Sequence, residues 1–187
     1  MNIFPLVKSV LDDVYAQIPL PNKDAKDEAI RYEIKVLREK YQELPYGITI
    51  DYSHPITRFA YLYSYVTAHA YTIYALIRDT SDLGSLFNIN QLRVCCLGGG
   101  PGSDLLGMLK FINTKKKSTT LMCRVYDRQE RWRESLGSVC NKLTSFSMVP
   151  TFRILDVTDA ETWIKYPEIS QNHLFIMSFF LSEVYTT

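Results

Sequence analysis

Four glycines gather within five residues near the middle of the chain, in the segment VCCLGGGPGSDLLG at 94–107. They are Gly98, Gly99, Gly100 and Gly102, and Pro101 stands before the last of them. Glycine loses more backbone entropy on ordering than any other residue, so such a cluster favours a backbone that bends sharply or lets another group approach closely. The cluster follows an apolar run and precedes a segment with helical spacing. This position predicts a ligand-binding turn between a strand and a helix.

The residues around these glycines restrict the kind of ligand. A P-loop requires a lysine directly after its last glycine, but Met108 follows Gly107. A dinucleotide-binding loop that begins at Gly98 requires a glycine at position 103, where the chain has Ser103. Asp104 adds a carboxylate to the first turn of the expected helix, where it would repel a pyrophosphate. The pattern therefore favours a nucleoside ligand without phosphates.

Apolar runs and helical segments alternate from residue 91 onward. Near-continuous apolar strands separated by helices are typical of a parallel sheet covered on both faces, so the sequence predicts an α/β fold. Strands are expected at 91–98, 120–127, 151–157 and 172–181, and helices at 103–113, 128–143 and 159–168. Asp127 and Asp156 end the second and third of these strands, so they are expected at the same sheet edge as the glycines.

The first half of the chain is predicted to be helical. Apolar residues recur at helical spacing in 6–15, 27–44 and 57–79, with a polar loop at 19–27 and a break at 45–55. The chain therefore divides into a helical region, 1–90, that covers the ligand side, and an α/β region, 91–187. Tyr61 and Tyr65 form a second face of the long helix. Packing between the two regions is the favoured role of this face, and contact with a cofactor is the alternative.

The pattern Gly98-x-Gly100-x-Gly102 and its surroundings resemble motif I of the class I S-adenosylmethionine-dependent methyltransferases. The resemblance covers residues 91–185 and implies a Rossmann-like parallel sheet with S-adenosyl-L-methionine as the cofactor. It implies that Asp127 binds the ribose hydroxyls, since one carboxylate can accept two O–H donors, and that Asp156 or Val157 contacts the adenine. The cofactor-binding residues predicted in this way are Gly98, Gly99, Gly100, Pro101, Gly102, Asp104, Asp127, Asp156 and Val157.

The same resemblance places groups near the transferred methyl in SFFLSEVY, at 178–185. Ser178, Phe179 and Glu183 are the candidates there, and Glu183 is the best general base if the acceptor must lose a proton. Together with LGGGPGSDLLG, this segment also resembles eukaryotic ribosomal-RNA methyltransferases, which implies RNA as the methyl acceptor. Each acidic residue has a plainer alternative: a helix cap at Asp127, a turn at Asp156 and a solvated side chain at Glu183.

Only four strands of the family's sheet can be placed, so the expected core is an incomplete class I methyltransferase core. The apolar fourth strand, LFIMSFF, would form an open edge, which promotes aggregation unless it is covered. Three arrangements would cover this edge. In the first, the chain is part of a longer protein; in the second, a partner chain such as a second copy in a homodimer continues the sheet; in the third, the helical region covers the edge in a protein that has lost catalysis. The first two are favoured. The other functions considered are a catalytically inactive methyltransferase-like interaction module and a nicotinamide oxidoreductase. Ser103 and Asp104 disfavour the latter.

The composition is that of a globular protein that acts away from membranes. Apolar residues make up 47% of the chain and its net charge is +1, so it lacks the strong basic field of a dedicated nucleic-acid binder. No stretch approaches the roughly 18 apolar residues of a membrane span. The four cysteines lack metal-binding spacing, so no metal site is expected, and reduced thiols in the cytoplasm or nucleus are predicted.

Overall fold

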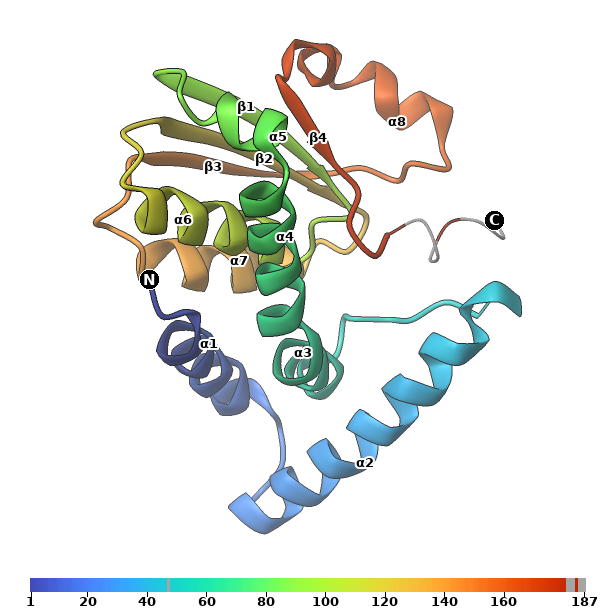
Figure 1. The fold of residues 1–187 in the computed structure, drawn as a ribbon. Coiled ribbons are helices and arrows are strands. Elements are labelled where there is room, and N and C mark those ends of the chain that lie inside the picture. Colours follow the sequence, from blue (N-terminus) through green and yellow to red (C-terminus); the bar gives the residue numbers. More distant parts are fainter. Residues whose placement is uncertain (47, 181–183, 185–187) are drawn as a thin grey trace.

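Four parallel strands form the central sheet of the computed structural model, which describes residues 1–46, 48–180 and 184. The strands are β1 (Gln91–Leu97), β2 (Thr120–Asp127), β3 (Met148–Ile154) and β4 (Leu174–Ile176). They lie in the order β3-β2-β1-β4 and pair in parallel (Figure 1). The predicted α/β class is confirmed, and the arrangement is consistent with a Rossmann-like fold.

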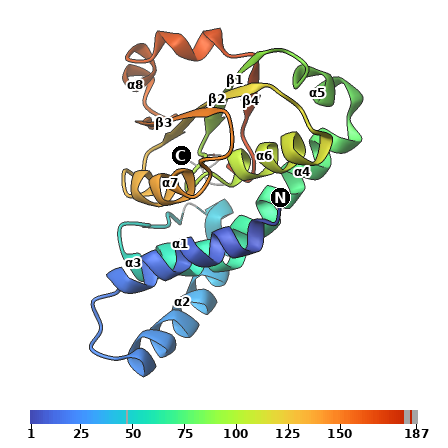
Figure 2. The same cartoon turned by 90° about the vertical axis from the view of Figure 1, so that its left-hand side faces the viewer.

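Helices cover both faces of the sheet, because parallel neighbours require long crossover connections (Figures 1 and 2). On one face lie α6 (Ser103–Lys115) and α7 (Trp132–Asn141), and on the other lies α8 (Ala160–Ile164), followed by a 3-10 turn at Pro167–Gln171. Alternate residues of β1 serve the two faces. Val94 and Cys96 join the core that includes α6 and α7, whereas Cys95 joins a smaller cluster with the residues around α8.

The first half of the chain is helical, as predicted. Its elements are α1 (Ile3–Gln17), α2 (Lys23–Glu43), a 3-10 turn (Leu44–Tyr46), α3 (Pro55–Tyr61), a π-helical turn (Leu62–Val66), α4 (Thr67–Asp79) and α5 (Ser81–Leu86). The π-helical turn joins α3 to α4, so the long helix expected at 57–79 is one nearly continuous helical run. The loop predicted at 19–27 is shorter than expected, because the Asn22 side chain accepts the Ala25 N–H and caps α2.

The helical region packs against α6 and α7 rather than standing apart from the sheet (Figure 2). α4 runs beside α6, and a Cβ on Gly107 of α6 would lie 2.5 Å from the carbonyl oxygen of Ala70. Only glycine permits this approach of the two backbones. One hydrophobic cluster consequently includes Val10 of α1, Ile73 of α4, Leu106 of α6 and Val125 of β2.

Two strands differ from their predicted bounds by more than one residue. β3 begins at Met148 and pairs with β2 up to the couple Ile154–Asp127, where β2 ends, so Asp156 follows the strand instead of ending it. The strand predicted at 172–181 is reduced to β4. The chain turns out of the sheet after it, and Phe179 adopts a positive φ of 56°.

β4 lies at the edge of the sheet in the part of the chain that the structure describes. Phe175 and Met177 are 44% and 47% exposed beside this edge, so the helical region, which borders it through Leu76 and Leu83, leaves both side chains partly open to solvent. No helix among the described residues is long and apolar enough to cross a membrane.

Candidate functional site

A narrow hollow opens where β1, β2 and β3 end, at the edge of the sheet that the glycine loop occupies. Ligands of open α/β sheets bind outside these carboxyl ends. Residues from both halves of the chain line the hollow: Tyr52, Tyr61, Gly98, Gly100, Asp127, Arg128, Gln129, Trp132, Leu155, Asp156, Val157, Phe180 and Val184. Of the predicted cofactor-binding residues, it therefore brings together Gly98, Gly100, Asp127, Asp156 and Val157.

The glycine loop bends sharply directly after β1. Gly98, Gly100 and Gly102 all have positive φ, at 63°, 47° and 93°. The Gly98 N–H donates to the carbonyl oxygen of Tyr126 at 2.8 Å, which fixes the loop to the end of β2. Gly99, Pro101 and Gly102 are buried and do not line the hollow. The loop thus presents two of its glycines to the hollow and packs the rest against the core.

The space that the glycine leaves open at position 98 is occupied by a side chain of the same protein. A Cβ on Gly98 would lie 2.0 Å from Cδ2 of Phe180, so the phenyl ring rests directly on the Gly98 backbone. Phe180 also lines the hollow and narrows it. A ligand that reaches Gly98 would therefore have to displace this ring.

Asp127 is the central polar residue of the hollow. Its Oδ2 accepts the Gly100 N–H at 3.0 Å and its Oδ1 accepts the Gln129 N–H at 2.9 Å. Burial raises the pKa of this carboxyl to about 6, although both N–H donors favour the ionised form. The second bond orders the turn before α7, which begins at Trp132 rather than at 128 as predicted. Asp127 therefore shapes the turn and also faces the hollow.

An aromatic wall stands opposite the strand ends. The ring of Tyr52 lies with its centroid 5.0 Å from that of Trp132, and the ring of Tyr61 lies 5.2 Å from the same indole. Tyr52 carries no local sequence signal, because it belongs to the irregular segment before α3. Tyr61 packs between the two regions and also lines the hollow.

The segment after β3 forms the remaining side of the hollow. The Leu155 N–H donates to the carbonyl oxygen of Asp127 at 3.1 Å, which extends the contact between the second and third strands. The Asp156 carboxylate accepts the hydroxyl of Thr158 at 2.7 Å and its N–H at 2.9 Å, and both bonds lower the pKa of Asp156. Asp156 thus stabilises a turn and also lines the hollow beside Val157.

Asp104 does not line the hollow but lies behind the glycine loop. It is 2% exposed in the first turn of α6, and burial raises its pKa to about 6. The hydroxyl of Ser178 donates to its Oδ1. This bond ties the segment after β4 to α6. Ser178 and Asp104 therefore lie together, away from the residues that face the hollow.

The other predicted residues near the transferred methyl lie apart from one another or outside the described residues. The ring of Phe179 stacks on His69 with centroids 3.8 Å apart and does not line the hollow. Burial lowers the pKa of His69 to about 4, which leaves it neutral at pH 7. Glu183 lies outside the residues that the structure describes.

The lining residues define the chemistry that the hollow can perform. Asp127 and Asp156 supply two carboxylates against one guanidinium, Arg128, so a polyphosphate would meet net negative charge. The carboxylates suit hydroxyl donors, and the aromatic wall suits a flat or cationic group. Within the described part of the chain, no three His, Cys, Asp or Glu side chains group in a way that could hold a metal ion.

The fold and the site define an α/β chain with a ligand hollow at the carboxyl ends of a parallel sheet. No protein-family model matches the sequence, and the searches of curated proteins and of solved structures also gave no match.

Proposed function

We propose that the chain is an S-adenosylmethionine-dependent methyltransferase, or the cofactor-binding portion of one, and that the cofactor binds in the hollow. The observation that carries this proposal is the Asp127 carboxylate at the end of β2, joined to the glycine loop through the Gly100 N–H. Each carboxylate oxygen has two acceptor sites, so Asp127 retains capacity for the ribose hydroxyls beside its two N–H donors. The residue types present therefore fit the nucleoside part of this cofactor.

Other lining residues fit the remaining parts of the molecule. Asp156 and Val157 are the residues that would hold the adenine, in keeping with the sequence resemblance. The rings of Tyr52, Tyr61 and Trp132 would attract a sulfonium cation, as would the negative balance of the lining charges. The absence of a phosphate group from this cofactor agrees with that balance.

The cofactor, when bound, supplies an activated methyl group on its sulfonium. The task of the chain is then to orient this group towards a nucleophile and to keep water away from it. The aromatic rings of Tyr52, Tyr61 and Trp132 line one side of the hollow and would exclude water there, whereas the Phe180 ring would have to move for the cofactor to reach Gly98. RNA is the acceptor that the sequence resemblance implies. All four cysteines are free thiols, which favours the cytoplasm or the nucleus.

The β4 edge supports a second candidate, a methyltransferase-like interaction module without catalysis. Phe175 and Met177 are exposed along an edge strand, which suits a partner chain or a second copy that continues the sheet. Such a module would bind a partner through β4 and would transfer no methyl group even if it bound the cofactor.

Calorimetric titration with S-adenosylhomocysteine tests the proposal. We expect saturable binding that weakens about 10- to 100-fold in Asp127→Asn, because a hydrogen bond to a charged group contributes about 1.5–3 kcal/mol. Asp82→Asn, which changes a carboxylate of α5 outside the hollow, is the matched control and should bind as the wild type does. No binding by the wild type contradicts the proposal, and binding of NAD instead supports the oxidoreductase.

A further inference from the structure

Arg58 of α3 is buried although no carboxylate pairs with it closely. The residue is 3% exposed, and its nearest ion-pair partner is Oε2 of Glu134 at 3.9 Å. Glu134 is 46% exposed and lies closer to Arg131, at 2.7 Å. The Nε of Arg58 has no hydrogen-bond partner among the described residues. Burial of a guanidinium without a close carboxylate opposes folding unless other groups accept its hydrogen bonds, so the acceptors around Arg58 need to be identified.

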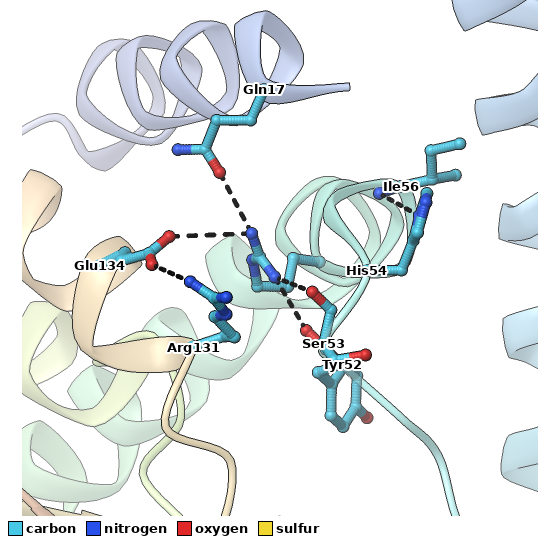
Figure 3. A network of polar contacts seen from close by, with 8 residues as sticks. Gln17, Tyr52, Ser53, His54, Ile56, Arg131 and Glu134 are labelled. Atoms are coloured by element: carbon cyan, nitrogen blue, oxygen red, sulfur yellow. Dashed lines mark hydrogen bonds and ion pairs between the residues drawn. The ribbon is translucent and has the colours of Figure 1, made fainter. Parts of the chain in front are cut away.

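The guanidinium instead binds the backbone of the segment before α3. Its Nη1 donates to the carbonyl oxygen of Tyr52 at 3.1 Å and to that of Ser53 at 2.5 Å, while Nη2 donates to Oε1 of Gln17 at 3.1 Å. The described residues from 48 to 54 form neither helix nor strand. Their path therefore depends on anchors of this kind, and Arg58 connects it to α1 and α3 at once. Figure 3 shows the partners Gln17, Tyr52 and Ser53 around this guanidinium.

The anchored segment carries Tyr52 to the hollow. The Tyr52 ring packs on Trp132 and Tyr61, with centroids 5.0 and 5.4 Å away. Its hydroxyl oxygen lies 2.7 Å from that of Tyr41, a residue of α2. Tyr52 is thus held at its backbone by Arg58 and at its far end by Tyr41, and the ring between these two points faces the hollow.

We propose that Arg58 is a positioning residue, which fixes Tyr52 as a wall of the ligand hollow without touching the ligand itself. This inference rests on the proposed function, because the wall matters only if the hollow binds a ligand. The planar fork of an arginine suits the task, since it can donate to two neighbouring carbonyl oxygens and to a third group at the same time. Lysine carries all its donors on one nitrogen, so it cannot span the two carbonyl oxygens and Gln17 in the same way and would hold the segment less firmly.

The placement of Tyr52 can be tested without any ligand. Trp132 is made the only tryptophan by Trp163→Phe, and its fluorescence reports whether Tyr52 still covers it. In this background we expect Arg58→Met to red-shift the emission and to raise the acrylamide quenching constant, as Tyr52→Ala does directly. Glu134→Gln, which removes the long ion pair and keeps the carbonyl contacts, should leave both unchanged. Equal quenching in Arg58→Met and the wild type, with cooperative unfolding in both, would overturn the proposal.

Binding measurements distinguish a positioning role of Arg58 from a general effect on stability. We expect Arg58→Met to weaken S-adenosylhomocysteine binding about tenfold, and to have little further effect once Tyr52 is alanine, because the two residues act through one contact. Additive losses would contradict the proposal. If Arg58→Met does not fold, Arg58→Lys replaces it, with a smaller change of the same sign expected. Failure of the wild type to bind refutes the proposed function, whereas the fluorescence arm still decides how Tyr52 is placed.

Discussion

We expect Asp104→Asn to gain stability relative to the wild type as the pH rises from acidic to neutral. The Asp104 carboxyl is 2% exposed, and burial raises its pKa from 3.8 to about 6. The folded state therefore binds the proton more tightly than the unfolded chain does. The stability that the protonated group contributes is complete below pH 3.8 and is lost as the pH rises through about 6.

The size of this effect follows from the shift itself. One pH unit in pKa corresponds to about 1.4 kcal/mol, so ionisation of Asp104 costs the folded protein about 3 kcal/mol, of which about 2 kcal/mol falls between pH 4.5 and pH 7. Asparagine is neutral throughout this range and keeps an oxygen that can accept the Ser178 hydroxyl. The free energy of unfolding of Asp104→Asn minus that of the wild type should thus rise by about 2 kcal/mol over this interval.

Urea unfolding followed by circular dichroism, repeated from pH 4.5 to pH 7, measures this difference. The matched control is Asp24→Asn, which makes the same change in the first turn of α2, where the carboxylate is exposed. The control corrects for the loss of a favourable charge at a helix N-terminus. Parallel curves for Asp104→Asn and the wild type would refute the reasoning, because they would show that burial does not penalise the charged form of Asp104.

Three further outcomes are expected. Binding of S-adenosylhomocysteine, measured by calorimetry, should weaken as the pH falls below about 6, the pKa of Asp127, because the ionised carboxylate is the better hydrogen-bond acceptor. The affinity of Asp127→Asn should not change over the same pH range. Gly98→Ala should lower the midpoint of thermal unfolding, since the residue has a φ of 63° and its Cβ would strike Phe180. The double variant with Phe180→Ala should recover the part of the loss that comes from this clash, but not the roughly 1–2 kcal/mol of backbone strain. Phe175→Lys should reduce any self-association through β4 that sedimentation detects in the wild type, and an unchanged profile would exclude this edge as the contact.

The elements that follow from local pattern were predicted best. β2 lies at the predicted residues, and β1 ends one residue before its predicted end, because continuous apolar runs bounded by polar residues define both. The alternation of such runs with helical segments also predicts the parallel sheet. The glycine loop was also predicted from local pattern, because four glycines within one short segment, each costly in backbone entropy, indicate a sharp turn.

The features that were missed depend on side-chain contacts that the local residue pattern does not encode. Nothing in the residues near Tyr52 shows that Arg58 and Tyr41 hold it, or that Trp132 receives its ring. In the turn after β4, the Ser178 hydroxyl likewise donates to Asp104, which lies far away in sequence. Apolar character continues through this turn, so periodicity alone extends the strand too far.

Because residues from both halves of the chain line the hollow, we expect that the α/β region cannot form the site alone. A fragment of residues 91–187 would lack Tyr52 and Tyr61 and would expose the surface of α6 that packs on α4 around Gly107. Leu105, Leu106 and the other apolar residues that share a cluster with the helical region would then lose part of their cover. We expect such a fragment to bind the dye ANS and to unfold without a cooperative transition, as loosely packed states do. A fragment that unfolds cooperatively would show instead that the sheet and its own helices suffice, and that the helical region contributes the aromatic wall and little of the stability.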